Sequence, residues 1–66
     1  MDFVKFSLAA ARVNAGLSQK NAAIALGISN KTLCSWENYQ TYPSADMAQK
    51  ICALYGIPFD QIRFTS

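Results

Sequence analysis

Hydrophobic and polar residues recur along this chain with the spacing of short α-helices. The clearest stretch is 19–26, whose apolar residues share one helical face, namely Ala22, Ala23 and Leu26. Ser18 stands before this stretch, and its side-chain oxygen can cap free backbone N–H groups at a helix start. Gly27 follows the last apolar residue, where helices commonly end in a left-handed conformation. The pattern predicts a helix over 19–26 followed by a change of direction.

A second short helical pattern begins directly after that turn. Ser29 is its predicted cap, and Leu33 and Trp36, spaced i, i+3, form its buried stripe. The opposite face carries short polar side chains and one cation, with no acidic residue: Asn30, Lys31, Thr32, Cys34 and Ser35. Two helices joined by a tight glycine turn are typical of the helix-turn-helix unit, whose second helix enters the DNA major groove.

The remaining segments also favour helices. The first is predicted over Met1–Asn14, with Asp2 as its cap and a stripe formed by Leu8, Ala11 and Ala15. Another is predicted between Ser44 and Gly56, with a stripe formed by Met47, Ile51 and Leu54, and a helical turn follows over 58–63, with Phe59 and Ile62 in the core. No strand-like alternation is visible. We expect one all-α domain over residues 1–66, a compact five-helix bundle with a central helix-turn-helix.

Composition narrows the classes of function. No apolar run reaches the roughly 18 residues of a membrane span, and no signal peptide is recognisable, so we expect a cytoplasmic protein. The chain has no histidine, Cys34 and Cys52 lack metal-site spacing, and no glycine-rich phosphate loop exists, so we expect no metal, cofactor or small-molecule ligand. The acidic residues are scattered without a paired spacing, which argues against an enzyme: Asp2, Glu37, Asp46 and Asp60. The net charge of +2 is mild for a nucleic-acid binder.

The polar face of the second helix fits direct readout of bases. Asn30 can bond an adenine edge, and Lys31 can donate to guanine O6 and N7. Thr32 can contact a phosphate or a thymine methyl group, and Ser35 lies one turn beyond Lys31 on the same face. The alternative for each residue is a solvated polar position, but their convergence on one face of this motif favours DNA contact.

The sequence resembles the phage Cro and repressor-type (xenobiotic-response-element-like) helix-turn-helix regulators. The resemblance covers about Leu8 to Ile62 and rests on GLSQ, Ala23, LGIS, Leu33, WEN and Pro43. It implies DNA contacts by Gln19 and Asn38, a structural ion pair between Arg12 and Glu37, and a two-fold dimer surface at Phe59, Ile62 and Phe64. A solvated Arg12 is the alternative to the ion pair.

The chain departs from the family pattern after the second helix of the motif. Tyr39 stands where relatives usually have glycine, and the loop that follows offers Gln40, Thr41 and Tyr42 in place of basic residues. Weaker anchoring to phosphates is the expected consequence, because association with DNA scales with the cations that touch it.

Two functions remain open at this point. The first is a sequence-specific DNA-binding transcription regulator from a phage or bacterium, a Cro-like repressor acting as a homodimer on a pseudo-palindromic operator. The alternative is an antirepressor or co-regulator that binds a partner repressor protein. It is favoured by three apolar residues away from the core stripes, which suggest a protein-binding surface: Phe6, Val13 and Ile24.

Overall fold

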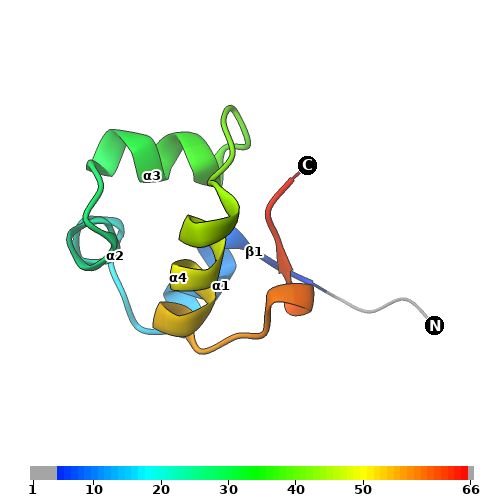
Figure 1. Cartoon of the computed structure of the whole chain (residues 1–66). Helices are drawn as coiled ribbons and strands as arrows, with labels where there is room; N and C mark the ends of the chain where they lie inside the picture. The colour runs from blue at the N-terminus through cyan, green and yellow to red at the C-terminus, as the bar shows by residue number, and fades with distance from the viewer. Residues whose placement is uncertain (1–4, 66) are drawn as a thin grey trace.

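The computed structural model describes residues 5–65, which form a small helical domain (Figure 1). The α-helices are α1 (Leu8–Asn14), α2 (Gln19–Leu26), α3 (Asn30–Glu37) and α4 (Ala45–Tyr55). Strand β1 (Phe6–Ser7) precedes α1, and a 3-10 turn (Phe59–Gln61) and strand β2 (Ile62–Arg63) follow α4. Helix α2 packs against α3 and α4, and α1 packs against the same two helices from behind. None of the helices in this described part is long and apolar enough to cross a membrane.

A serine caps the amino-terminal end of each α-helix in the described residues. The hydroxyl oxygens of Ser7, Ser18, Ser29 and Ser44 each accept a hydrogen bond from the backbone N–H three residues on, at 3.0 to 3.3 Å. The predicted caps Ser18, Ser29 and Ser44 are confirmed, and so are the bounds of α2. These local signals define most of the helix starts.

The turn between α2 and α3 depends on the backbone conformation of Gly27. Its φ is 73°, in the left-handed region that the sequence predicted. A side chain at this position would meet no atom within 4 Å, so the need for glycine is conformational rather than steric. The next amide, that of Ile28, returns to the Ala23 carbonyl at 3.0 Å. This bond terminates α2, and the chain then changes direction into α3.

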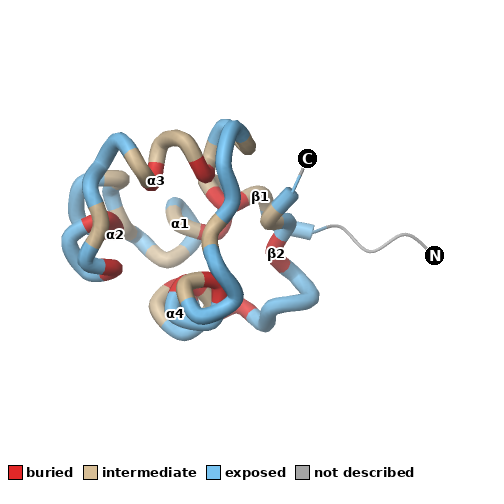
Figure 2. Tube along the Cα trace, turned by 45° about the horizontal axis from the view of Figure 1, so that its top comes forward, coloured by how far each residue is buried: buried red, intermediate tan, exposed pale blue. Residues whose placement is uncertain are grey.

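The core lies where α1, α2, α3 and α4 meet, as the buried segments in Figure 2 show. Leu8, Leu33 and Ile51 are completely buried there, and Trp36 is nearly so. The predicted inward stripe of α3 is therefore confirmed. In α4 the stripe is rotated from the prediction: Ala48, Ile51 and Tyr55 are buried, whereas Met47 and Leu54 are half-buried. Alanine at 48 presents little bulk and leaves room for close packing of the helix.

The two ends of the described segment differ from the prediction. Helix α1 begins at Leu8 and is capped by Ser7, because Phe6 and Ser7 are extended and pair in parallel with Ile62 and Arg63. The proposed start at Met1 and the cap at Asp2 lie outside the described residues.

The expectation of five helices without strands is corrected in the same region. Four α-helices, one 3-10 turn and a two-stranded sheet are present between residues 5 and 65. Strands of two residues are too short to show an alternating pattern. Phe59 is 60% exposed, so its predicted place in the core is wrong, whereas Ile62 is buried.

Candidate nucleic-acid interface

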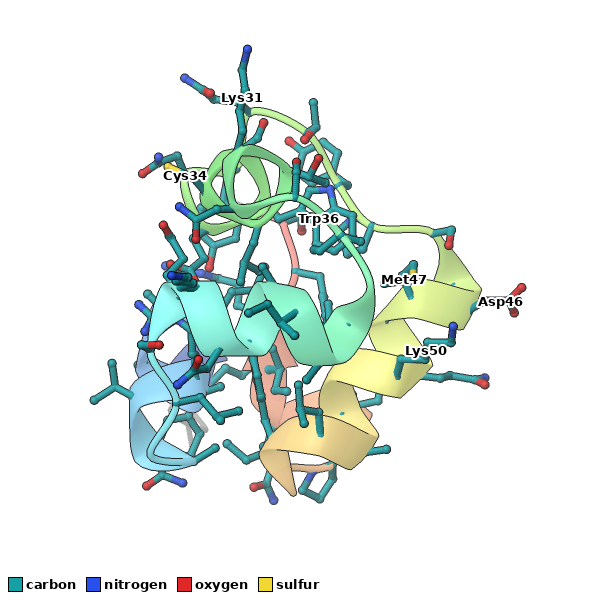
Figure 3. The ribbon with its side chains drawn as sticks, turned by 90° about the vertical axis from the view of Figure 1, so that its left-hand side faces the viewer. Lys31, Cys34, Trp36, Asp46, Met47 and Lys50 are labelled. Carbon is teal, nitrogen blue, oxygen red and sulfur yellow. The ribbon has the colours of Figure 1, made fainter. Side chains whose placement is uncertain are left out.

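Helix α3 lies at the surface of the domain with its polar face outward. Leu33 and Trp36 point into the core, while Asn30 and Lys31 are exposed. Figure 3 shows Lys31 projecting away from the body of the protein on the side of α3 opposite the rest of the fold. The Lys31 ammonium makes no hydrogen bond or ion pair with residues 5–65, so it is available to an external partner.

A largely buried ion pair joins α1 to the end of α3. Arg12 Nε lies 2.7 Å from Glu37 Oε2, and Arg12 Nη2 donates to Glu37 Oε1 at 3.4 Å. The two side chains are only 15% and 7% exposed. Arg12 Nη1 also donates to the Leu17 carbonyl at 2.9 Å. Because both charges have additional partners, burial of the pair is tolerated, and it fixes α3 relative to α1.

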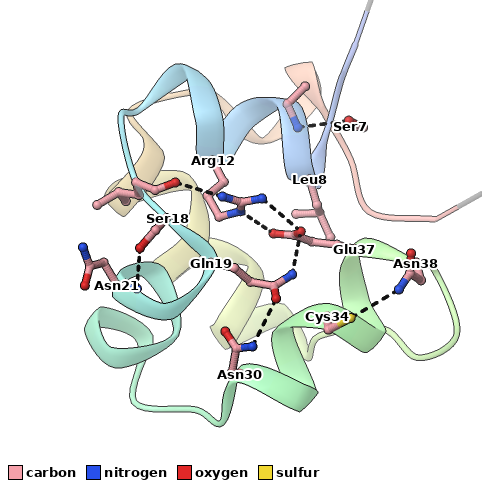
Figure 4. Close-up of polar contacts among 12 residues, drawn as sticks. Ser7, Leu8, Arg12, Ser18, Gln19, Asn21, Asn30, Cys34, Glu37 and Asn38 are labelled. Atoms are coloured by element: carbon pink, nitrogen blue, oxygen red, sulfur yellow. Dashed lines mark hydrogen bonds and ion pairs between the residues drawn. The ribbon is translucent and has the colours of Figure 1, made fainter.

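A chain of hydrogen bonds extends from this ion pair to the exposed face of α3 (Figure 4). Gln19 Nε2 donates to Glu37 Oε1 at 3.1 Å, and Gln19 Oε1 accepts from Asn30 Nδ2 at 3.2 Å. The carboxylate can only accept, so it determines which way the Gln19 amide is turned. The Asn30 side chain is therefore held in position while its Oδ1 and second N–H remain free, the donor and acceptor that an adenine edge requires.

The other predicted contact residues are also engaged within the protein. The Thr32 hydroxyl lies 2.8 Å from that of Ser29, and the Ser35 hydroxyl lies 2.8 Å from that of Thr41. Asn38 Nδ2 donates to Cys34 Sγ at 3.4 Å. A hydroxyl can donate and accept at once, so these bonds orient the side chains without using all of their capacity. The contact with Thr41 was not foreseen from the sequence, because it joins the loop to the helix.

Tyr39 is the residue whose importance the sequence indicated only indirectly. It comes two residues after the end of α3, next to the C-cap Asn38, and has a φ of 59°, a conformation that costs a residue other than glycine roughly 1–2 kcal/mol. Its hydroxyl donates to the Arg63 carbonyl at 3.1 Å and accepts from the Leu8 N–H at 3.4 Å. The guanidinium carbon of Arg63 lies 5.4 Å from the centre of its ring. These contacts offset the strain of the left-handed conformation.

The residues suggested as protein-contact surface fall into separate groups. Phe59 and Phe64 stack with their ring centres 5.2 Å apart, whereas Ile62 beside them is only 3% exposed and belongs to the core. Val13 on α1 and Ile24 on α2 are 63% and 67% exposed. The side chain of Phe6 is less exposed, at 37%.

The two cysteines form neither a disulfide nor part of a metal-binding group within the described residues. Both thiols are free and half-buried, and burial raises the pKa of Cys52, which keeps it protonated. No three side chains of the types His, Cys, Asp and Glu gather among residues 5–65 to hold a metal ion.

Tyr55 carries a buried hydroxyl without a hydrogen-bond partner in the described chain. Burial raises its pKa to about 12, with a further increase from the Glu37 carboxylate and an opposing effect of Arg12. We expect Tyr55→Phe to raise the free energy of unfolding by about 1 kcal/mol at neutral pH, since it removes an unsatisfied group.

The same substitution should change how the free energy of unfolding depends on pH above 10. In the wild type the unfolded chain loses the Tyr55 proton near pH 10 while the folded chain keeps it to about 12, so stability falls across this window by about 1.4 kcal/mol per pH unit. Tyr55→Phe lacks this component. Urea unfolding at pH 7, 10 and 11 measures the difference, which should widen above pH 10; a constant difference would contradict the assignment.

The fold and this surface define a class of protein: a small domain in which a helix-turn-helix presents its second helix to solvent. A model of the helix-turn-helix family, of the Cro and repressor type, matches residues 8–62, and the chain belongs to this family. Neither a curated protein nor a solved structure matches this chain. Membership supports a role as a DNA-binding transcription regulator.

Proposed function

We propose that this protein is a Cro-like repressor that binds a pseudo-palindromic operator as a homodimer. The observation that carries the proposal is the exposed pair on α3, with Lys31 unengaged and Asn30 held by Gln19 and the buried ion pair. A side chain fixed in advance loses less freedom when it binds a base, which improves both affinity and selectivity. Repression would follow from occupancy of the operator, and no chemistry is required.

The homodimer is proposed to form through the aromatic pair at the carboxyl end. Phe59 and Phe64 border a partly open hollow of about 360 Å³, which is also lined by Lys5, Asp60, Ile62, Arg63 and Thr65. Apolar rings surrounded by charges of both signs suit a two-fold contact, in which a cation of one copy faces the carboxylate of the other. The two α3 helices would then enter successive major grooves about 34 Å apart.

Selection from randomised duplexes tests the function directly. The full chain should enrich an inverted repeat, and fluorescence anisotropy with the selected duplex should show affinity that falls as salt rises. The slope of log affinity against log salt should be about −0.9 for each phosphate neutralised. Binding that enriches no sequence, or that ignores salt, would contradict the proposal.

A second candidate function is supported by the exposure of Val13 and Ile24. Exposed apolar side chains of this size tend to mark protein contacts, which suits an antirepressor or co-regulator that binds a partner repressor. In that case Val13→Ser and Ile24→Ser should abolish binding to the partner while leaving the weak DNA contact unchanged. The salt-dependence experiment separates the two functions, since only the regulator binds a selected duplex alone.

A further inference from the structure

The segment after α3 and the carboxyl-terminal strand lie on the same side of the molecule, away from α2 (Figures 1 and 2). Both pack against the hydrophobic core, and one side chain also links them by hydrogen bonds. The Tyr39 hydroxyl binds the Arg63 carbonyl in β2 and the Leu8 N–H at the start of α1, two positions that are 24 and 31 residues away in the chain. The Leu8 N–H has no partner within its own helix, so Tyr39 also satisfies a donor at a helix start.

The backbone conformation and the ring of Tyr39 both contribute to this link. Its backbone is left-handed, and the Arg63 guanidinium carbon lies over its ring, 5.4 Å from the ring centre. Strand β2 also pairs with β1, and Phe64, the residue after β2, stacks on Phe59. The segment that follows α3 and the strand that leads to the aromatic pair are thus hydrogen-bonded through one phenol group, in addition to the core that they share.

We propose that Tyr39 is a positioning residue that fixes the angle between α3 and the dimer surface, and thereby the half-site spacing that the dimer accepts. This inference rests on the proposed function. Inserting one base pair between half-sites turns one half-site by roughly 35° about the DNA axis relative to the other. Only a dimer with a rigid connection between its interface and its two reading helices rejects that change.

The test compares Tyr39→Phe with the matched control Tyr42→Phe. Tyr42 is an exposed loop tyrosine, and its hydroxyl makes no hydrogen bond with the described residues. The probes are duplexes with two inverted copies of the selected half-site, at the selected spacing and one base pair shorter or longer, together with a single half-site duplex.

Tyr39→Phe removes both hydrogen bonds of the hydroxyl and is expected to reduce the preference for the selected spacing by about 3- to 10-fold, near the lower end of what two hydrogen bonds support. Its affinity for the single half-site should be unchanged, which a merely structural role would not predict. Tyr42→Phe should retain the full preference. Tyr39→Gly accepts the left-handed turn without strain and deletes both bonds, so it should show the same loss even if Tyr39→Phe folds poorly.

Two outcomes separate a failure of the role proposed for Tyr39 from a failure of the proposed function. If the wild type selects an inverted repeat but the Tyr39 variants keep its spacing preference, the inference is overturned and the proposed function stands. If the wild type selects no inverted repeat, the proposed function fails and the inference fails with it.

Discussion

Replacing Arg12 with methionine is expected to lower the free energy of unfolding by about 3–5 kcal/mol, because it leaves the buried Glu37 carboxylate without its charge partner. Methionine preserves much of the apolar stem of arginine, so the loss arises mainly from the guanidinium. Glu37 is 7% exposed and would retain only the hydrogen bond from Gln19. A domain of 66 residues has a total stability of roughly 3–10 kcal/mol, so this single change approaches global unfolding.

Urea unfolding followed by circular dichroism measures this effect, and two further variants define its cause. Lys50→Met removes an exposed cation from α4 and should change stability by less than about 0.5 kcal/mol. Arg12→Met combined with Glu37→Leu should recover most of the loss, since it removes both buried charges. An Arg12→Met variant within about 1 kcal/mol of the wild type would show that the pair is effectively solvated.

Those parts of the fold that depend on neighbouring residues could be predicted from the sequence. A serine that caps a helix bonds an amide three residues away, and a glycine that ends a helix adopts its own backbone conformation. Ser18, Gly27 and Ser29 therefore defined the helix-turn-helix correctly. The inward stripe of α3 followed from the spacing of Leu33 and Trp36 alone.

Features that depend on distant residues could not be predicted in this way. Ser7 caps α1 where Phe6 and Ser7 itself pair with Ile62 and Arg63, more than fifty positions away. Phe59 and Ile62 have similar hydrophobicity, yet β pairing buries one and leaves the other exposed. The distinction arises from tertiary context and has no local signal.

The candidate site was predicted as a set of residues but not as a connected structure. Family resemblance implied the pairing of Arg12 with Glu37, and the polar face of α3 indicated Asn30. That Gln19 joins them became visible only when three helices were placed together. The resemblance indicated Tyr39 only as a departure from glycine, and its left-handed φ and its bond to β2 depend on residues distant in the chain.

Replacing Lys31 with alanine is expected to weaken operator binding with little effect on folding. A good contact to guanine is worth about 1–3 kcal/mol, and a two-fold dimer makes it twice, so the total loss is about 2–6 kcal/mol, or at least about 30-fold in affinity. Because Lys31 is exposed and has no bond to the described residues, its removal should shift the free energy of unfolding by less than about 0.5 kcal/mol.

Lys50→Ala is the matched control, because it removes the same charge from a different face. Figure 3 shows Lys50 on α4, on another side of the molecule from Lys31. Anisotropy titrations with the selected duplex, and with duplexes changed at single base pairs, should show that Lys31→Ala loses both affinity and the preference for one base pair. Equal losses for the two variants would mean that Lys31 acts only through its charge, and an unchanged affinity for Lys31→Ala would remove α3 as the reading helix.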